Sequence, residues 1–145
     1  MAGDLFVPAR SLRDVASRLL RHQRVTLPHH SLIAWQRADD LFIHLHAVSR
    51  QFPNIERFEL GAQLRRAAYS VPANIAEGFG RHTPADRLHF LQVASAALAE
   101  VGYCLHAAKR LEYISDAQYR ELETAVRRTA SPLRGLMKSM GRGHP

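Results

Sequence analysis

Residues 59–81 read ELGAQLRRAAYSVPANIAEGFGR, and this stretch decides the fold because it carries two stripes of side chains at helical spacing. The apolar stripe predicts a core-facing helix side and comprises Leu60, Leu64, Ala67, Ala68, Val71, Ile75 and Phe79. The polar stripe comprises Gln63, Arg66, Ser70, Asn74, Glu77 and Arg81. A surface helix needs only the apolar stripe. The polar stripe is therefore either a second contact surface or a chance arrangement of solvent-facing residues.

Proline and glycine residues mark the middle and the end of this helix. Pro72 lacks a backbone N–H and crowds the carbonyl of Ala68, so we expect a kink or local break there. Gly78 and Gly80 are expected to cap the helix C-terminus.

We interpret three residues of the polar stripe as structural rather than catalytic: Ser70, Asn74 and Glu77. Their polar groups can satisfy backbone groups that a proline kink exposes, or can bond a neighbouring helix or subunit. Glu77 can also form an ion pair with Arg81, four residues further on.

Length and composition predict a single all-α domain. The chain has 145 residues and is rich in helix-forming residues, without runs of β-branched residues. A single cysteine, Cys104, excludes an internal disulfide and suits a reducing cytoplasm, where we expect the protein to act. No uninterrupted apolar run approaches the length of about 20 residues that spans a membrane, so no membrane partner is expected.

The remaining start and stop signals predict an up-and-down antiparallel four-helix bundle over residues 31–140. The first helix is expected to run from Ser31, as N-cap, to about Phe52. The third is expected to start at the N-cap Thr83 and end near residue 112, and its wide apolar arc predicts packing on more than one neighbour. Ser115 with Gln118 predicts a capping box that opens the fourth helix, which Pro132 is expected to kink.

Residues 1–30 form a basic N-terminal extension that stands apart from the bundle. A capping-box pattern at Ser11 and Asp14 predicts an additional short amphipathic helix within it. A basic arm for nucleic acid or a partner groove, a flexible tail and an over-extended translation start are the alternatives. Residues 141–145 are expected to be a loose tail.

No residue pattern predicts an enzyme, a metal site or a cofactor site. The nine histidines lack a spacing that would place ligands on one helix face; His44 and His46, for example, are two residues apart and diverge. Cys104 lies on an apolar helix side, so we interpret it as a buried hydrophobic residue and not as a nucleophile. No phosphate-binding glycine loop occurs.

The formal net charge of +7, carried by 18 arginines and 2 lysines against 13 acidic residues, permits a polyanionic partner. It also fits a merely solvated basic surface. The candidate phosphate-binding residues recur mostly in pairs: Arg65, Arg66, Arg81, Arg87, Arg127 and Arg128. Few aromatic residues lie between them, so binding to RNA or DNA would be backbone-directed and salt-sensitive.

Several motifs resemble a known family. Trp35-Gln36, the run QLRRAA at residues 63–68, and the run SVPANIAEGFGR at residues 70–81 resemble the four-helix-bundle proteins, also called the 23S rRNA intervening-sequence protein family. The resemblance covers about residues 32–140, and its most specific positions are Trp35, Ser70, Pro72, Asn74, Glu77 and Gly78. The first thirty residues and Pro132 depart from the family pattern.

The resemblance implies a bundle that assembles as a homopentameric ring, in a family whose biochemical role is mostly unassigned. The accessory protein of diversity-generating retroelements looks similar, and there a basic barrel engages a reverse transcriptase and nucleic acid. We therefore expect a non-enzymatic, self-assembling ring that binds nucleic acid or a nucleic-acid-processing partner. The alternative is a structural scaffold or protein-interaction module that does not bind nucleic acid.

Overall fold

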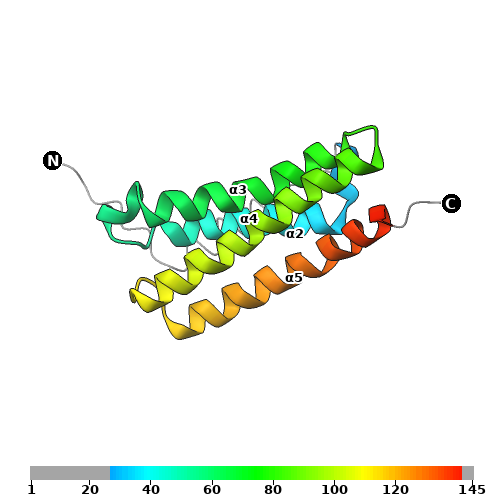
Figure 1. Ribbon diagram of the computed structural model, residues 1–145. Coiled ribbons are helices and arrows are strands. Elements are labelled where there is room, and N and C mark those ends of the chain that lie inside the picture. The colour runs from blue at the N-terminus through cyan, green and yellow to red at the C-terminus, as the bar shows by residue number, and fades with distance from the viewer. Residues whose placement is uncertain (1–26, 142–145) are drawn as a thin grey trace.

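Four long helices run alongside one another in alternating directions, as the computed structural model of residues 27–141 shows (Figure 1). They are α2 (Ile33–Ser49), α3 (Leu60–Phe79), α4 (Pro84–Arg110) and α5 (Asp116–Gly141), with two short 3-10 helices, η1 (Pro28–Ser31) and η2 (Asn54–Arg57). Each long helix packs against the next one along the chain, and α5 closes the bundle by packing against α2. The predicted all-α, up-and-down four-helix bundle is confirmed. The predicted helix near Ser11 and most of the predicted tail lie outside the described residues.

The core forms where the apolar stripes of the four helices meet. Six of the seven stripe residues predicted on α3 are buried or pack against the core, and Leu64 and Ile75 are fully buried. Phe79 is the exception, because 43% of its surface is exposed. It is the last residue of α3, and Gly78 takes the inward position at that level. As predicted, α4 packs on two neighbours, α3 and α5.

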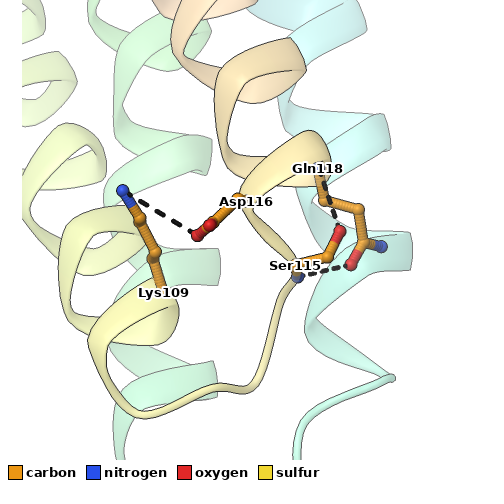
Figure 2. Close-up of polar contacts among 4 residues, drawn as sticks. All are labelled: Lys109, Ser115, Asp116 and Gln118. Atoms are coloured by element: carbon orange, nitrogen blue, oxygen red, sulfur yellow. Dashed lines mark hydrogen bonds and ion pairs between the residues drawn. The ribbon is translucent and has the colours of Figure 1, made fainter.

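The starts of α4 and α5 are fixed by local capping bonds. The backbone N–H of Asp86 donates to the Thr83 hydroxyl over 3.2 Å, which confirms the predicted cap of α4. The predicted capping box of α5 is reciprocal: the Gln118 N–H donates to the Ser115 Oγ over 3.1 Å, and the Ser115 N–H donates to the Gln118 Oε1 over 3.0 Å (Figure 2). Figure 2 also shows Lys109, at the end of α4, reaching Asp116 across 3.9 Å.

The predicted ends of α2 are wrong at both termini. Ser31 belongs to η1, where its hydroxyl donates to the Pro28 carbonyl over 2.8 Å, and α2 begins two residues later without a side-chain cap. The helix ends at Ser49, although Phe52 remains buried in the turn that follows. Pro28 is the first residue of η1, a position that favours proline. The chain therefore forms a 3-10 turn immediately before α2 begins.

The prediction for Gly78 is also wrong. The residue at the C-cap of α3 is Gly80, with an ordinary φ of −79°, while Gly78 lies inside the helix and is buried. A Cβ atom at position 78 would lie only 3.1 Å from both the Arg87 carbonyl oxygen and the Phe90 Cβ. Gly78 is therefore needed for its small size, which lets α3 and α4 approach closely.

Neither proline interrupts its helix, since α3 is continuous through Pro72 and α5 through Pro132. Of the two outcomes expected at Pro72, a kink or a local break, the break does not occur. A proline at position 132 leaves the carbonyl of residue 128, one turn earlier, without its helical donor. Arg37 of α2 supplies a donor instead, since its Nη1 lies 2.8 Å from the Arg128 carbonyl oxygen. Beside it, the buried Thr129 hydroxyl donates to the Ala125 carbonyl over 3.0 Å. Arg37 thus joins α2 to α5 at the point where the proline weakens α5.

A second polar contact joins the two loops at the opposite end of the bundle. The Tyr113 hydroxyl, from the α4–α5 turn, donates to Oε1 of Glu56 in η2 over 2.8 Å. The other carboxylate oxygen of Glu56 accepts the backbone N–H of Leu60 over 3.0 Å, at the start of α3. This hydrogen bond to the carboxylate is the main reason that the pKa of Tyr113 is raised.

Candidate functional site

The polar stripe of α3 is bonded mainly along its own helix. The side-chain amide of Asn74 donates to the Ser70 carbonyl over 2.7 Å and to the Ser70 hydroxyl over 2.9 Å, and both residues are half-buried. Arg81 forms an ion pair with Glu77 at 2.6 Å, so the structure contains the pair that the sequence suggested. These contacts give the stripe a fixed arrangement of side chains on one side of α3.

The end of that stripe borders a surface hollow of about 480 Å³. Its lining residues are small or charged: Ala73, Ala76, Glu77, Gly80, Arg81 and His82. Small side chains on one helix side allow another helix to approach closely, as the contact at Gly78 illustrates inside the protomer.

Arg65, first among the candidate phosphate-binding residues, is committed to contacts within the protomer. Its guanidinium donates to the Ser49 hydroxyl over 3.1 Å and to the Arg57 carbonyl over 2.6 Å, and the side chain is half-buried. A guanidinium held in this way links α2, η2 and α3, and its two terminal nitrogens are each already bonded within the protomer. Its neighbour Arg66 is exposed and makes no hydrogen bond or ion pair with any other residue between 27 and 141.

Arg81 and Arg87 meet at the α3–α4 turn. The Arg81 guanidinium lies 4.6 Å from the centre of the Phe90 ring, in addition to its pair with Glu77. Arg87 Nε donates to the Arg81 carbonyl over 2.7 Å. These two candidates therefore hold the turn together, and their charges are partly neutralised or engaged there.

The outward side of α5 carries a regular row of basic residues. Of these, Arg127 is among the predicted phosphate-binding residues. We call this row the α5 basic stripe; its residues follow one another at steps of four and three, and all are exposed: Arg120, Thr124, Arg127, Ser131, Arg134 and Lys138. Arg127 forms an exposed pair with Glu123 at 3.0 Å. Arg128 is exposed beside the stripe. The seven-residue spacing of Arg120, Arg127 and Arg134 was the signal that could have identified it.

The described part of the bundle offers neither a metal site nor an activated nucleophile. Among the described residues, no group of three or more histidine, cysteine or acidic side chains is placed to hold a metal ion. Cys104 is buried, and burial, followed by the nearby Glu100 charge, raises the pKa of its thiol. A raised thiol pKa lowers the fraction of the reactive thiolate at neutral pH.

Trp35, one of the residues that carry the family resemblance, is covered by two histidines of η1. The His30 ring stacks on the indole at 4.3 Å between ring centres, and His29 meets it edge-on at 5.1 Å. Burial, followed by the neighbouring His30, lowers the pKa of His29. His29 and His30 fall at the end of the extension that was predicted to stand apart from the bundle, yet they cover the first turn of α2.

The protein should lose stability as the pH falls through about 6.5, in part because of His46. Burial first, and then the charges of Arg50 and Arg65, lower the pKa of His46 below its ordinary value of 6.5. The unfolded chain then binds a proton that the folded chain binds less well, so acidification favours unfolding. Melting temperatures at about pH 7.5 and pH 5.5 should differ less in His46→Gln than in the native chain. His106→Gln, at an exposed position of α4, should keep the native difference; equal differences in all three would contradict this assignment.

By average hydropathy and length, α4 is the single helix among residues 27–141 that could cross a membrane. In the structure it packs between α3 and α5 as a helix of the bundle. Part of its apolar surface nevertheless faces outward: Ala96 and Ala99 are exposed, and Tyr103 keeps 70% of its surface exposed.

Comparisons with known proteins agree with the fold. A family model described as 23S rRNA-intervening sequence protein matches residues 30–135. Among solved structures, the chain resembles a crystal structure of a protein with unknown function from the S23 ribosomal protein family of Bacteroides thetaiotaomicron. The two chains share 22% identity with a TM-score of 0.69, over 73% of this chain and 96% of the other. At this identity the likeness shows a shared fold. No curated protein matches the chain.

Proposed function

The chain belongs to the 23S rRNA-intervening sequence protein family, and from this premise we propose that it is a non-enzymatic, self-assembling helical-bundle protein that binds nucleic acid through basic surfaces. The observation that carries self-assembly is the outward side of α4. The apolar residues Ala96, Ala99 and Tyr103 face solvent in the protomer, although Gln92, Glu100 and His106 are exposed on the same helix. Exposed apolar residues that lie together on one helix side are typical of an interaction surface.

A second copy of the chain is the occupant that fits this surface. Alanines permit close helix packing, and a large tyrosine ring such as Tyr103 is typical of an interface core. The small-residue hollow of α3 offers a complementary surface for close approach, next to Tyr69, which is also exposed. The resemblance to the family sets the expected number of subunits at five, in a closed ring.

Self-assembly is tested by measuring the particle mass in solution. Sedimentation velocity at micromolar concentration should give about five times the protomer mass of 16.3 kDa. Ala99→Glu combined with Tyr103→Glu should shift the protein towards monomer, because two charges would be buried without partners in the interface. Thr124→Glu, an exposed position on α5, should leave the mass unchanged.

A folded monomer in the native chain would overturn the self-assembly proposal. A native assembly that the two α4 substitutions leave intact would retain self-assembly and reject α4 as its interface. Circular dichroism of each variant separates loss of assembly from loss of fold.

The nucleic-acid part of the proposal is supported by the charge of the protomer, +7, which assembly would multiply. Assembly matters for affinity because several weak phosphate-binding surfaces on one particle act together on a long polyanion. The alternative, a scaffold without nucleic-acid binding, predicts that the assembled protein binds neither RNA nor DNA even at low salt.

A further inference from the structure

The α5 basic stripe is a straight, exposed row of cations with hydroxyl groups between them. Its first and last residues, Arg120 and Lys138, are 18 positions apart, which corresponds to about 27 Å along a helix. Arg120, Arg127 and Arg134 repeat every seven residues, or about 10.5 Å. Thr124 and Ser131 lie between the arginines on the same side of the helix.

Positive charge is concentrated in the C-terminal part of the stripe. Residues 124–141 contain no acidic residue and four basic ones: Arg127, Arg128, Arg134 and Lys138. Arg127 of the stripe forms an ion pair with Glu123, and such an exposed i,i+4 pair contributes little stability. A phosphate group can therefore replace Glu123 at small cost.

The chemistry of the stripe fits a nucleic-acid backbone better than a protein surface. Arginine presents paired N–H donors that match phosphate oxygens, and the Ser131 hydroxyl can add a further donor. The Thr124 hydroxyl instead donates to the Arg120 carbonyl over 2.9 Å. A protein interface of useful affinity needs apolar or aromatic anchors, and the stripe has none. The same lack of aromatic rings argues against a single strand, whose bases would need stacking surfaces.

We propose that the α5 basic stripe binds the sugar–phosphate backbone of a nucleic-acid duplex, with Arg127, Arg134 and Lys138 as the main phosphate contacts. This assignment rests on the nucleic-acid part of the proposed function and adds to it the surface and the class of ligand. It moves the expected contacts away from Arg65 and Arg87, whose guanidinium groups donate to carbonyl oxygens of the protomer. It also moves them away from Arg81, which lies over the Phe90 ring in addition to its pair with Glu77. Binding is independent of sequence because only phosphates and sugars are contacted.

The test compares two triple variants of the full chain that change the charge equally. The stripe variant carries Arg127→Glu, Arg134→Glu and Lys138→Glu; the control variant carries Arg50→Glu, Arg57→Glu and Arg110→Glu, at exposed positions outside α5 that are not candidate phosphate contacts. Each triple lowers the formal charge by six, from +7 to +1. Binding of fluorescent 20-base-pair RNA and DNA duplexes, and of single-stranded RNA, is measured from about 50 to 300 mM salt, with polyglutamate as competitor.

The stripe variant should bind duplexes on the order of tenfold or more weakly than the control variant at low salt. The slope of log Kd against log salt should fall by about 3, since each lost phosphate contact removes about 1. The RNA and DNA arms identify which duplex is preferred. Arg134→Gln with Lys138→Gln repeats the measurement with less charge repulsion if the triple variant does not assemble.

The outcomes separate this inference from the proposed function. If the native protein binds no nucleic acid at low salt, the nucleic-acid part of the proposed function fails, and the inference fails with it. If the native protein binds duplexes and the stripe and control variants lose affinity equally, only the assignment to α5 is overturned. Tighter binding of single strands, or equal competition by polyglutamate at matched charge, would overturn the assignment to a duplex backbone.

Discussion

Replacing Gly78 by valine should lower the free energy of unfolding by about 1–3 kcal/mol more than the same replacement at Gly102. Both glycines lie inside helices, so the change in helix propensity is shared between the two variants. They differ in the space around them. A Cβ at Gly78 would meet the Arg87 carbonyl and the Phe90 Cβ at 3.1 Å, whereas a Cβ at Gly102 meets nothing within 4 Å.

The excess cost at Gly78 comes from separating α3 and α4, because both nearby atoms belong to or adjoin the backbone of α4 and cannot rotate away. Chemical denaturation of the two variants at equal protomer concentration measures it, since assembly makes apparent stability depend on concentration. Equal losses in both variants would show that the close approach at Gly78 is unimportant for stability.

Replacing Arg37 by alanine should cost about 1–3 kcal/mol, which is large for an exposed side chain on a helix. The reason is that Pro132 leaves the Arg128 carbonyl without a helical donor, and Arg37 donates to it over 2.8 Å. Arg66→Ala is the matched control, because Arg66 is also exposed within a helix and has no such contact with the described residues. Its cost should stay within about 0.5 kcal/mol.

A double-mutant cycle identifies the cause. Pro132→Ala restores a backbone N–H at position 132, which can donate to the Arg128 carbonyl. In that background Arg37→Ala should cost at least about 0.5 kcal/mol less than in the native chain. Additive effects would mean that Arg37 stabilises the protein by some other route, such as simple packing against α5.

Features that depend on neighbouring residues in the chain were predictable from the sequence. The cap at Thr83 and the reciprocal box of Ser115 and Gln118 involve bonds across three residues, so the residue types at fixed spacing suffice to identify them. The apolar stripe of α3 likewise follows from spacing along one helix. The fold follows because these local signals agree with one another.

Features that depend on contacts between helices were not predictable in the same way. Gly78 appeared to be a cap, because a glycine near a helix end usually is one; its actual constraint comes from α4. The kink or break expected at Pro72 and the kink expected at Pro132 both assumed an uncompensated carbonyl. At Pro132, however, a residue 91 positions away from Arg128 supplies the donor. From the sequence, Pro132 implies that the carbonyl of residue 128 needs a donor from elsewhere. It does not indicate that this donor is Arg37.

The candidate site shows the same division. The sequence selected arginines that occur in pairs, but pairing along the chain does not indicate whether a guanidinium is free. Arg65 is held by Ser49 and Arg57, which are 16 and 8 residues away. Identifying the α5 basic stripe requires both the helical spacing of its residues and their exposure in the folded protein. Arg127 is its one member that lies next to another arginine in the sequence.

The contact between Glu56 and Tyr113 has a consequence for how the bundle fluctuates. One carboxylate serves two loops, since it accepts from the α4–α5 turn and from the first N–H of α3. Opening either loop alone would leave part of the carboxylate without its donor, so the two loops should open together as one cooperative unit. In hydrogen exchange, the amides of η2 and of residues 111–115 should then share one opening free energy although they are far apart in the chain. Ionisation of Tyr113 at high pH would uncouple the two loops, because the phenolate can no longer donate to Glu56 while the bond from Leu60 remains.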